Sequence, residues 1–369
     1  MILTGLMACD NVTWEGVELR LEAPPATDTA AEVVTDTVPE AEQDLPPLDL
    51  DPGLFLVDRR GAPLGTEGGG GESGARARMM PVALLDSEGL EAFPSPDQVE
   101  RLGERFIRER MSPDRRFVLY ARGARVGSFF PDSAGSVPAF GAESPAGAGE
   151  ATGGPLCTPR PVVTGWVEIL PDAADEDRLV ALPEESAVVL EHGGYQARSS
   201  TQDQRVAALN LASALYVTRE IVWPPSVVEA RADVQVFQLP GSAEEHIAAT
   251  FLYGDSLAVG PAPPNAYSLF FIGRPPTGTG RYQETYVRYR EAGPDGKSVP
   301  RWINHVDWDG DGRENVLLEV FGETGRSFAA LSRTDGGWEQ VFEEECPTPT
   351  APVALRTAPP VAGIDDADR

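Results

Sequence analysis

Residues 307–315 (DWDGDGREN) carry the residue types and the spacing of a cation-binding loop. Calcium prefers six to eight oxygen ligands, and aspartates at alternate positions direct three carboxylates toward one point. A glycine at the sixth position of the loop allows a sharp turn that presents the next backbone carbonyl as a further ligand. The predicted calcium ligands are Asp307, Asp309, Asp311, the carbonyl of Arg313 and the side chain of Asn315. The alternative is an acidic hairpin turn that holds no ion.

This loop is similar to those of EF-hands, dockerins and integrin-like FG-GAP or VCBS repeats, and its flanks distinguish among them. An EF-hand has a helix on each side and a bidentate glutamate at the twelfth position, where this chain has Leu318. Residues 301–306 and 316–321 are instead β-branched and aromatic, as strands are. The loop therefore resembles the FG-GAP or VCBS kind, in a single copy. That resemblance implies a calcium loop on a β-hairpin and leaves the overall fold open.

A second resemblance lies at the N-terminus, where residues 6–9 (LMAC) resemble a bacterial lipobox. It implies that Cys9 becomes the lipidated first residue of a mature protein anchored to a membrane. Residues 1–9 lack the basic start and the full apolar stretch of a complete signal, so they form a truncated lipoprotein signal-like segment. A start codon further upstream and an ordinary cysteine both remain open. Residues 22–52 hold nine acidic residues, several prolines and no basic residue, which predicts an acidic tether.

The two other cysteines, Cys157 and Cys346, lie at the two ends of a strand-rich region. Neither has the CxxC spacing or a nearby histidine that would indicate zinc. In an oxidising compartment such a pair is expected to form a disulfide that joins the ends of the region. In a cytosolic protein the same residues would be two unpaired thiols.

The elements between these signals predict a fold that is mainly β with some α (α+β). A small unit at 53–131 is expected to have the order ββαββ, with strands at 54–57, 80–85, 116–121 and 125–130 and a helix that begins near Ser95. Residues 132–156 are a Gly/Ala/Pro linker. Residues 157–346 are expected to form a larger antiparallel β-rich unit. It has strands near 162–170 and 186–191, a helix at 202–217 opened by a capping box of Thr201 and Gln204, and a meander of eight strands. Residues 347–369 are predicted to be a disordered tail.

Composition narrows the possible functions. The net charge of −28 and the pI of about 4.4 disfavour nucleic acid as a partner. No HExxH or GxSxG motif indicates a catalytic site, and no catalytic residue is predicted. The first hypothesis is a non-catalytic, lipid-anchored envelope protein that binds another envelope protein or a glycan, or is structural. The alternative is an exported hydrolase with glycosidase-like carboxylate chemistry and a structural calcium. A secreted soluble form is the alternative location.

Overall fold

The computed structural model describes residues 53–60, 75–86, 89–92, 105–132, 137–139, 154–158, 160–186, 194–275, 281–294 and 296–346. Cys9, the predicted tether at 22–52, most of the predicted linker and the tail at 347–369 lie outside these ranges. No helix among the described residues is long and apolar enough to cross a bilayer.

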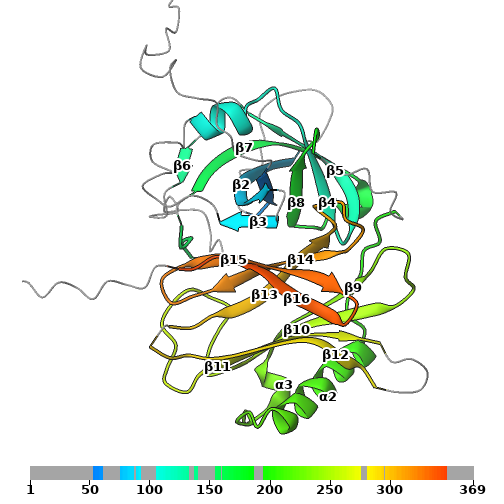
Figure 1. Ribbon diagram of the computed structural model, residues 1–369, viewed down its shortest axis with the longest axis vertical. Coiled ribbons are helices and arrows are strands. Elements are labelled where there is room, and N and C mark those ends of the chain that lie inside the picture. Colours follow the sequence, from blue (N-terminus) through cyan, green and yellow to red (C-terminus); the bar gives the residue numbers. More distant parts are fainter. Residues whose placement is uncertain are drawn as a thin grey trace, which may run out of the picture. The chain divides into compact units, whose positions relative to one another are not determined.

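Six strands close into an antiparallel barrel (Figure 1). Its strands, in ring order, are β2 (Ala75–Asp86), β1 (Gly53–Asp58), β8 (Arg178–Pro183), β4 (Phe117–Ala121), β5 (Ala124–Pro131) and β7 (Arg160–Ile169). The β2–β7 pairing completes the ring, and the short strands β3 (Gly89–Ala92) and β6 (Val137–Ala139) extend it beside β2 and β7. Closure removes the exposed strand edges that an open sheet would carry.

The barrel interior is filled by side chains from alternate positions of its strands. Phe55, Phe117 and Phe129 are fully buried there and contact one another edge to face, with centroids 5.1 and 6.4 Å apart. A helical turn at 105–110 adds Phe106 to the same cluster. Strands β5 and β7 approach closely at Gly127, where an added Cβ would collide with the carbonyl of Glu168. The tight curvature of the barrel therefore depends on a glycine at this point.

Two four-stranded antiparallel sheets follow the barrel in the chain. The first has the order β12-β11-β10-β9 and the second has the order β13-β14-β15-β16. Their strands are β9 (Arg231–Gln238), β10 (Glu245–Tyr253), β11 (Tyr267–Arg274), β12 (Gln283–Glu291), β13 (Val299–Val306), β14 (Asn315–Phe321), β15 (Arg326–Thr334) and β16 (Gly337–Glu343). All pair with their sequence neighbours, as a meander does.

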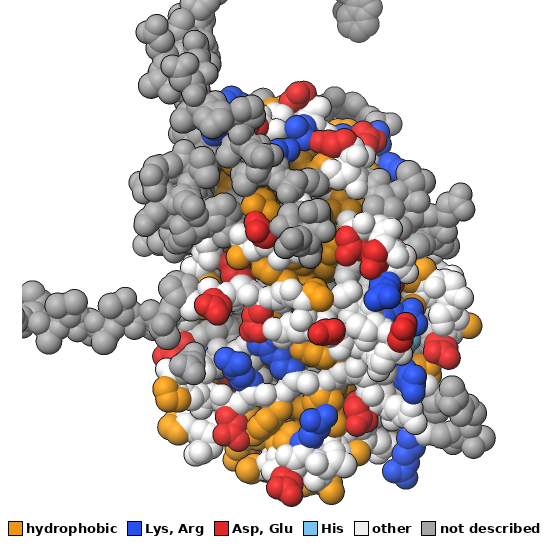
Figure 2. Space-filling view, viewed as in Figure 1, with side chains coloured by type: hydrophobic (Ala, Val, Ile, Leu, Met, Phe, Trp, Pro, Cys, Tyr) orange, Lys and Arg blue, Asp and Glu red, His pale blue; other side chains and the backbone are white. Residues whose placement is uncertain are grey.

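The two sheets stack in layers, and each sheet buries apolar side chains on both of its faces. Helices α2 (Gln202–Thr218) and α3 (Val227–Ala230) cover one face of the first sheet, whose other face packs on the second sheet. The second sheet packs its remaining face on the outside of the barrel (Figure 1). The capping box predicted for α2 is present, because the Thr201 hydroxyl accepts from the Gln204 amide and the Gln204 side chain accepts from the Thr201 amide. On the face shown in Figure 2, acidic and basic side chains are interspersed.

The predicted α+β class is wrong. Of the residues that the structure describes, 51% lie in strands and 13% in helices, and the fold is a barrel with two antiparallel sheets. The four strands predicted for the small ββαββ unit all form, but they do not make a sheet of their own. Strands β7 and β8, which follow the predicted linker, pair with β2, β5, β1 and β4 and so complete the barrel. These pairings join segments far apart in the sequence, and no local pattern indicates them.

Candidate metal centre

The loop at residues 307–314 connects β13 to β14, so both of its flanks are strands, as their β-branched and aromatic residues predicted. Asp307 is buried, and its two carboxylate oxygens accept hydrogen bonds from the backbone amides of Gly310 (2.7 Å) and Gly312 (2.9 Å). Both glycines have positive φ, 72° and 83°, a region that other residues rarely adopt. The turn is therefore folded around the Asp307 side chain, which fixes the position of the first predicted ligand.

Three carboxylates converge in this turn. Each of Asp307, Asp309 and Asp311 offers an oxygen, and these oxygens all lie within 4.8 Å of one another. Burial, and then the hydrogen bond and negative charge of Asp307, raise the pKa of Asp309 above its ordinary value. Like charges this close are unfavourable unless a cation or a proton neutralises one of them. The cluster is able to hold a metal ion, and its all-oxygen donor set suits a hard divalent cation.

The two other predicted ligands follow in the same loop. Asn315 is buried at the start of β14, and its side-chain nitrogen lies 3.4 Å from an Asp309 carboxylate oxygen. The Arg313 backbone amide donates to the Asp311 carboxylate at 2.7 Å, while its side chain extends into solvent. The loop thus brings together the four side chains that were predicted as ligands, those of Asp307, Asp309, Asp311 and Asn315. The backbone of Arg313 lies next to them.

The residues just before the loop bind it to the barrel. The side-chain oxygen of Asn304 accepts from the Arg122 amide at 2.6 Å, and the His305 carbonyl accepts from the Gly123 amide at 2.9 Å. Trp308, inside the loop, is 4% exposed and packs in the cluster between the second sheet and the barrel. The barrel turn at Arg122-Gly123 and the metal loop therefore meet at one junction.

Glu314 is a feature of the site that the sequence did not indicate. It is 4% exposed, and burial together with the negative charge of Asp307 raises its pKa to about 8, while Arg333 acts in the opposite direction. A glutamate in a polar loop is ordinarily expected at the surface. Only the packing of the loop against the barrel turn, where a Cβ on Gly123 would lie 3.7 Å from a Glu314 oxygen, reveals its burial.

The predicted disulfide between Cys157 and Cys346 is present, with Cα atoms 5.0 Å apart. Around it, residues 154–157 run beside the start of β15. The Cys157 amide donates to the Arg326 carbonyl at 2.8 Å, and the Arg326 amide donates to the Pro155 carbonyl at 2.7 Å. The bond thus joins the segment that enters β7 to the end of the second sheet, rather than the two ends of an independent domain.

The two histidines that the structure describes, His246 and His305, are both buried. His246 is buried against Phe237, and this burial lowers its pKa to about 4. His305 is buried at the junction described above, with a ring nitrogen 3.2 Å from the Gln238 carbonyl. Both positions suit packing between the sheets better than exchange of protons with a substrate.

The chain matches no protein-family model, no curated protein and no solved structure. Its function must therefore be argued from its own residues.

Proposed function

We propose that this chain is an exported, calcium-stabilised β-rich protein of a bacterial cell envelope, which binds an envelope protein or a glycan or has a structural role. One observation carries the proposal of calcium. Three aspartate oxygens within 4.8 Å of one another lie in a turn whose backbone is folded around Asp307. Calcium is the cation that such flexible oxygen-rich loops favour, whereas magnesium demands a smaller and more regular shell.

The location rests on other features. The Cys157–Cys346 disulfide fits an oxidising compartment. The lipobox-like residues before Cys9 and the acidic segment at 22–52 support a lipid anchor followed by a spacer.

Binding or support fits the described residues better than hydrolysis does. A glycosidase needs two carboxyl groups that are free to exchange protons or to attack. In the pocket lined by the end of β16, Glu343 is held by Arg288 and Glu344 by Arg160, at 2.6 Å each. Carboxylates neutralised in this way are poor acids and poor nucleophiles. The two unpaired carboxylates of the same lining, Glu323 and Glu345, are exposed to solvent rather than enclosed as a catalytic pair is.

Calcium binding is tested by thermal unfolding and titration calorimetry with and without the ion. At a dissociation constant of roughly 10⁻⁴–10⁻³ M, about 10 mM calcium adds about 1.4–2.7 kcal/mol to the free energy of unfolding. For a chain of this size that corresponds to a rise in Tm of about 3–10 °C. EDTA should abolish the rise, and magnesium should reproduce little of it.

A matched pair of variants separates ligation from general charge effects. Asp309→Ala should remove the calcium response, because it deletes a central carboxylate of the triad. Asp335→Ala, in the exposed turn between β15 and β16 of the same sheet, should retain it. If wild-type protein shows neither heat nor a Tm shift at millimolar calcium, the loop is only an acidic turn.

A further inference from the structure

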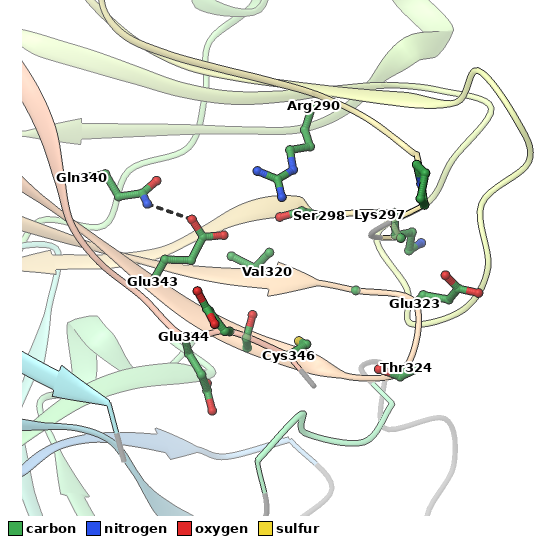
Figure 3. Close-up of a pocket in the computed structure, with 15 residues that line it drawn as sticks. Arg290, Lys297, Ser298, Val320, Glu323, Thr324, Gln340, Glu343, Glu344 and Cys346 are labelled. Atoms are coloured by element: carbon green, nitrogen blue, oxygen red, sulfur yellow. Dashed lines mark hydrogen bonds between the residues drawn. The ribbon is translucent and has the colours of Figure 1, made fainter. Parts of the chain in front are cut away.

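A pocket of about 600 Å³ lies at the end of the second sheet that is opposite the metal loop. Three segments form it: the connection from β12 to β13, the turn from β14 to β15, and the end of β16 (Figure 3). The metal loop lies at the other end of the β13–β14 hairpin, about 25 Å away for strands of seven to eight residues. The volume is within the range of roughly 300–1,000 Å³ that small-molecule sites occupy.

Three of the six charged residues that line this pocket, Lys297, Glu343 and Glu344, are already neutralised by a partner. Glu343 binds Arg288 through both oxygens, at 2.6 and 3.2 Å, and also accepts from Gln340 at 2.8 Å. Lys297 is buried against Asp255 at 2.6 Å, with side chains 2% and 3% exposed. Arg288 is held at the same time by the Ser298 hydroxyl at 2.6 Å. These paired residues therefore have fixed positions in the pocket lining.

Three charges in the lining remain without such partners. Within the described part of the chain, Arg290 forms no ion pair or side-chain hydrogen bond, and neither do Glu323 and Glu345. Figure 3 shows the Arg290 guanidinium extending from β12 toward Ser298 and Glu343, over the centre of the pocket. Among the residues that the structure describes, the unneutralised lining therefore carries one positive and two negative charges.

The hydroxyl of a buried serine adds an independent sign of a ligand. Ser327, on β15, lines the pocket although the residue is only 2% exposed. Its side chain forms no hydrogen bond with another described residue. Buried polar groups ordinarily have a partner, so an uncommitted hydroxyl that faces a cavity indicates a hydrogen-bonding occupant or water.

We propose that this pocket binds a basic amino acid, with the carboxylate on Arg290, the ammonium groups on Glu345 and Glu323, and a hydrogen bond to Ser327. A ligand with one negative and two positive charges complements the unpaired lining charge for charge. An arginine guanidinium pairs with a planar carboxylate through two parallel hydrogen bonds, which lysine cannot reproduce. This inference does not depend on calcium, because no predicted calcium ligand lines the pocket.

Titration calorimetry of the full chain with L-lysine and with L-arginine tests the proposal. Saturable binding of at least one is expected. Cadaverine, which has the two amines without a carboxylate, should bind more weakly than lysine, and glutarate, which has only carboxylates, should bind weakest. Three results would overturn the proposal: no heat with either amino acid at millimolar concentrations, cadaverine equal to lysine, or glutarate stronger than both.

Variants locate the site. Arg290→Gln and Glu345→Gln should each weaken lysine binding about five- to tenfold. This loss of affinity is larger than that expected for an exposed ion pair and smaller than that for a charge-assisted hydrogen bond. The controls Arg281→Gln and Glu339→Gln should leave the affinity unchanged. Arg281 lies two residues before β12 and Glu339 lies on β16; both are exposed and neither lines the pocket. All four residues are exposed, so the variants should fold, which melting curves verify. Equal loss in variants and controls would refute the assignment to this pocket. Repeating the titration in EDTA keeps the result separate from that of the metal loop.

Discussion

The buried carboxylate of Glu319 should contribute a large share of the attachment between the barrel and the second sheet. Glu319 lies on β14 with no side-chain exposure, and three arginines bind it: Arg178 at 2.6 Å, Arg301 at 2.5 Å and Arg326 at 2.5 Å. Arg178 comes from β8 of the barrel, whereas the other two come from β13 and β15 of the sheet. One glutamate thus holds guanidinium groups from both bodies of the fold.

The magnitude follows from the pKa of this carboxyl. Burial alone would raise it, but the charges of Arg178, Arg301 and Arg326 outweigh burial and lower the pKa from 4.5 to about 2. That difference corresponds to roughly 3 kcal/mol in favour of the ionised, folded form. Because the folded pKa is the lower one, this stability is fully present above about pH 4.5. It is lost as the pH falls from there toward 2.

Glu319→Gln keeps the side-chain shape and leaves three partly buried guanidinium groups, 14–17% exposed, without their counter-charge. Removing one partner of a buried ion pair costs about 3–5 kcal/mol, so we expect a loss of that size at pH 7 in urea unfolding. The difference between wild type and variant should shrink as the pH approaches 2, where the wild-type carboxyl is protonated. Glu339→Gln, exposed on β16, is the matched control and should change stability by less than about 0.5 kcal/mol. A cost for Glu319→Gln below about 1 kcal/mol at pH 7, or one that does not vary with pH, would refute this reasoning.

Two further predictions concern the cysteines. Cys9→Ala should move the protein from the membrane fraction to the soluble fraction and remove an acyl mass from the mature chain; a wild-type protein that is already soluble and unacylated would contradict the anchor. Reduction of the Cys157–Cys346 bond should lower the free energy of unfolding by roughly 2–5 kcal/mol, since it closes a loop of 189 residues. The Cys157→Ser/Cys346→Ser double variant should show the same loss without reductant and no further loss with it, and any additional effect of reductant on that variant would point to a different cause.

The individual strands were largely predictable because their signals are local. Predicted strands at 116–121 and 125–130 and the strand-like flank at 316–321 correspond to β4, β5 and β14 within a residue or so. Strand β2 begins earlier than expected, at Ala75. In its first half, alanine and methionine side chains that face the barrel interior alternate with arginine side chains that face outward. Ala77 and Met79 are fully buried in the barrel, yet the stretch ARAR reads as polar. Strand β8 was missed altogether, although RLVALP is a continuous apolar run of the kind that a strand buried on both faces shows.

The arrangement of those strands was not predictable by the same means. The barrel closes only because β7 pairs on one side with β5 and on the other with β2, across separations of many tens of residues. The candidate metal loop was accessible from the sequence since all its oxygens lie within nine consecutive residues. The pocket at the other end of the hairpin draws Arg290, Ser327 and Glu345 from three separate segments, and no spacing rule connects them.

The β13–β14 hairpin carries three contacts that a metal at its loop would influence together. Trp302 packs in the core between the two sheets, Asn304 and His305 bind the barrel turn, and Trp308 fills the cluster between sheet and barrel. The unfolded chain does not hold the three aspartates at the required spacing, so the free energy of binding the proposed calcium ion would add to the free energy of folding. A loop at a free hairpin tip would stabilise only its own turn. Here the loop adjoins the point where barrel and sheets meet, and an ion bound there stabilises the packing of both. This placement favours a structural role for the metal, at a distance from the pocket where a ligand is proposed to bind.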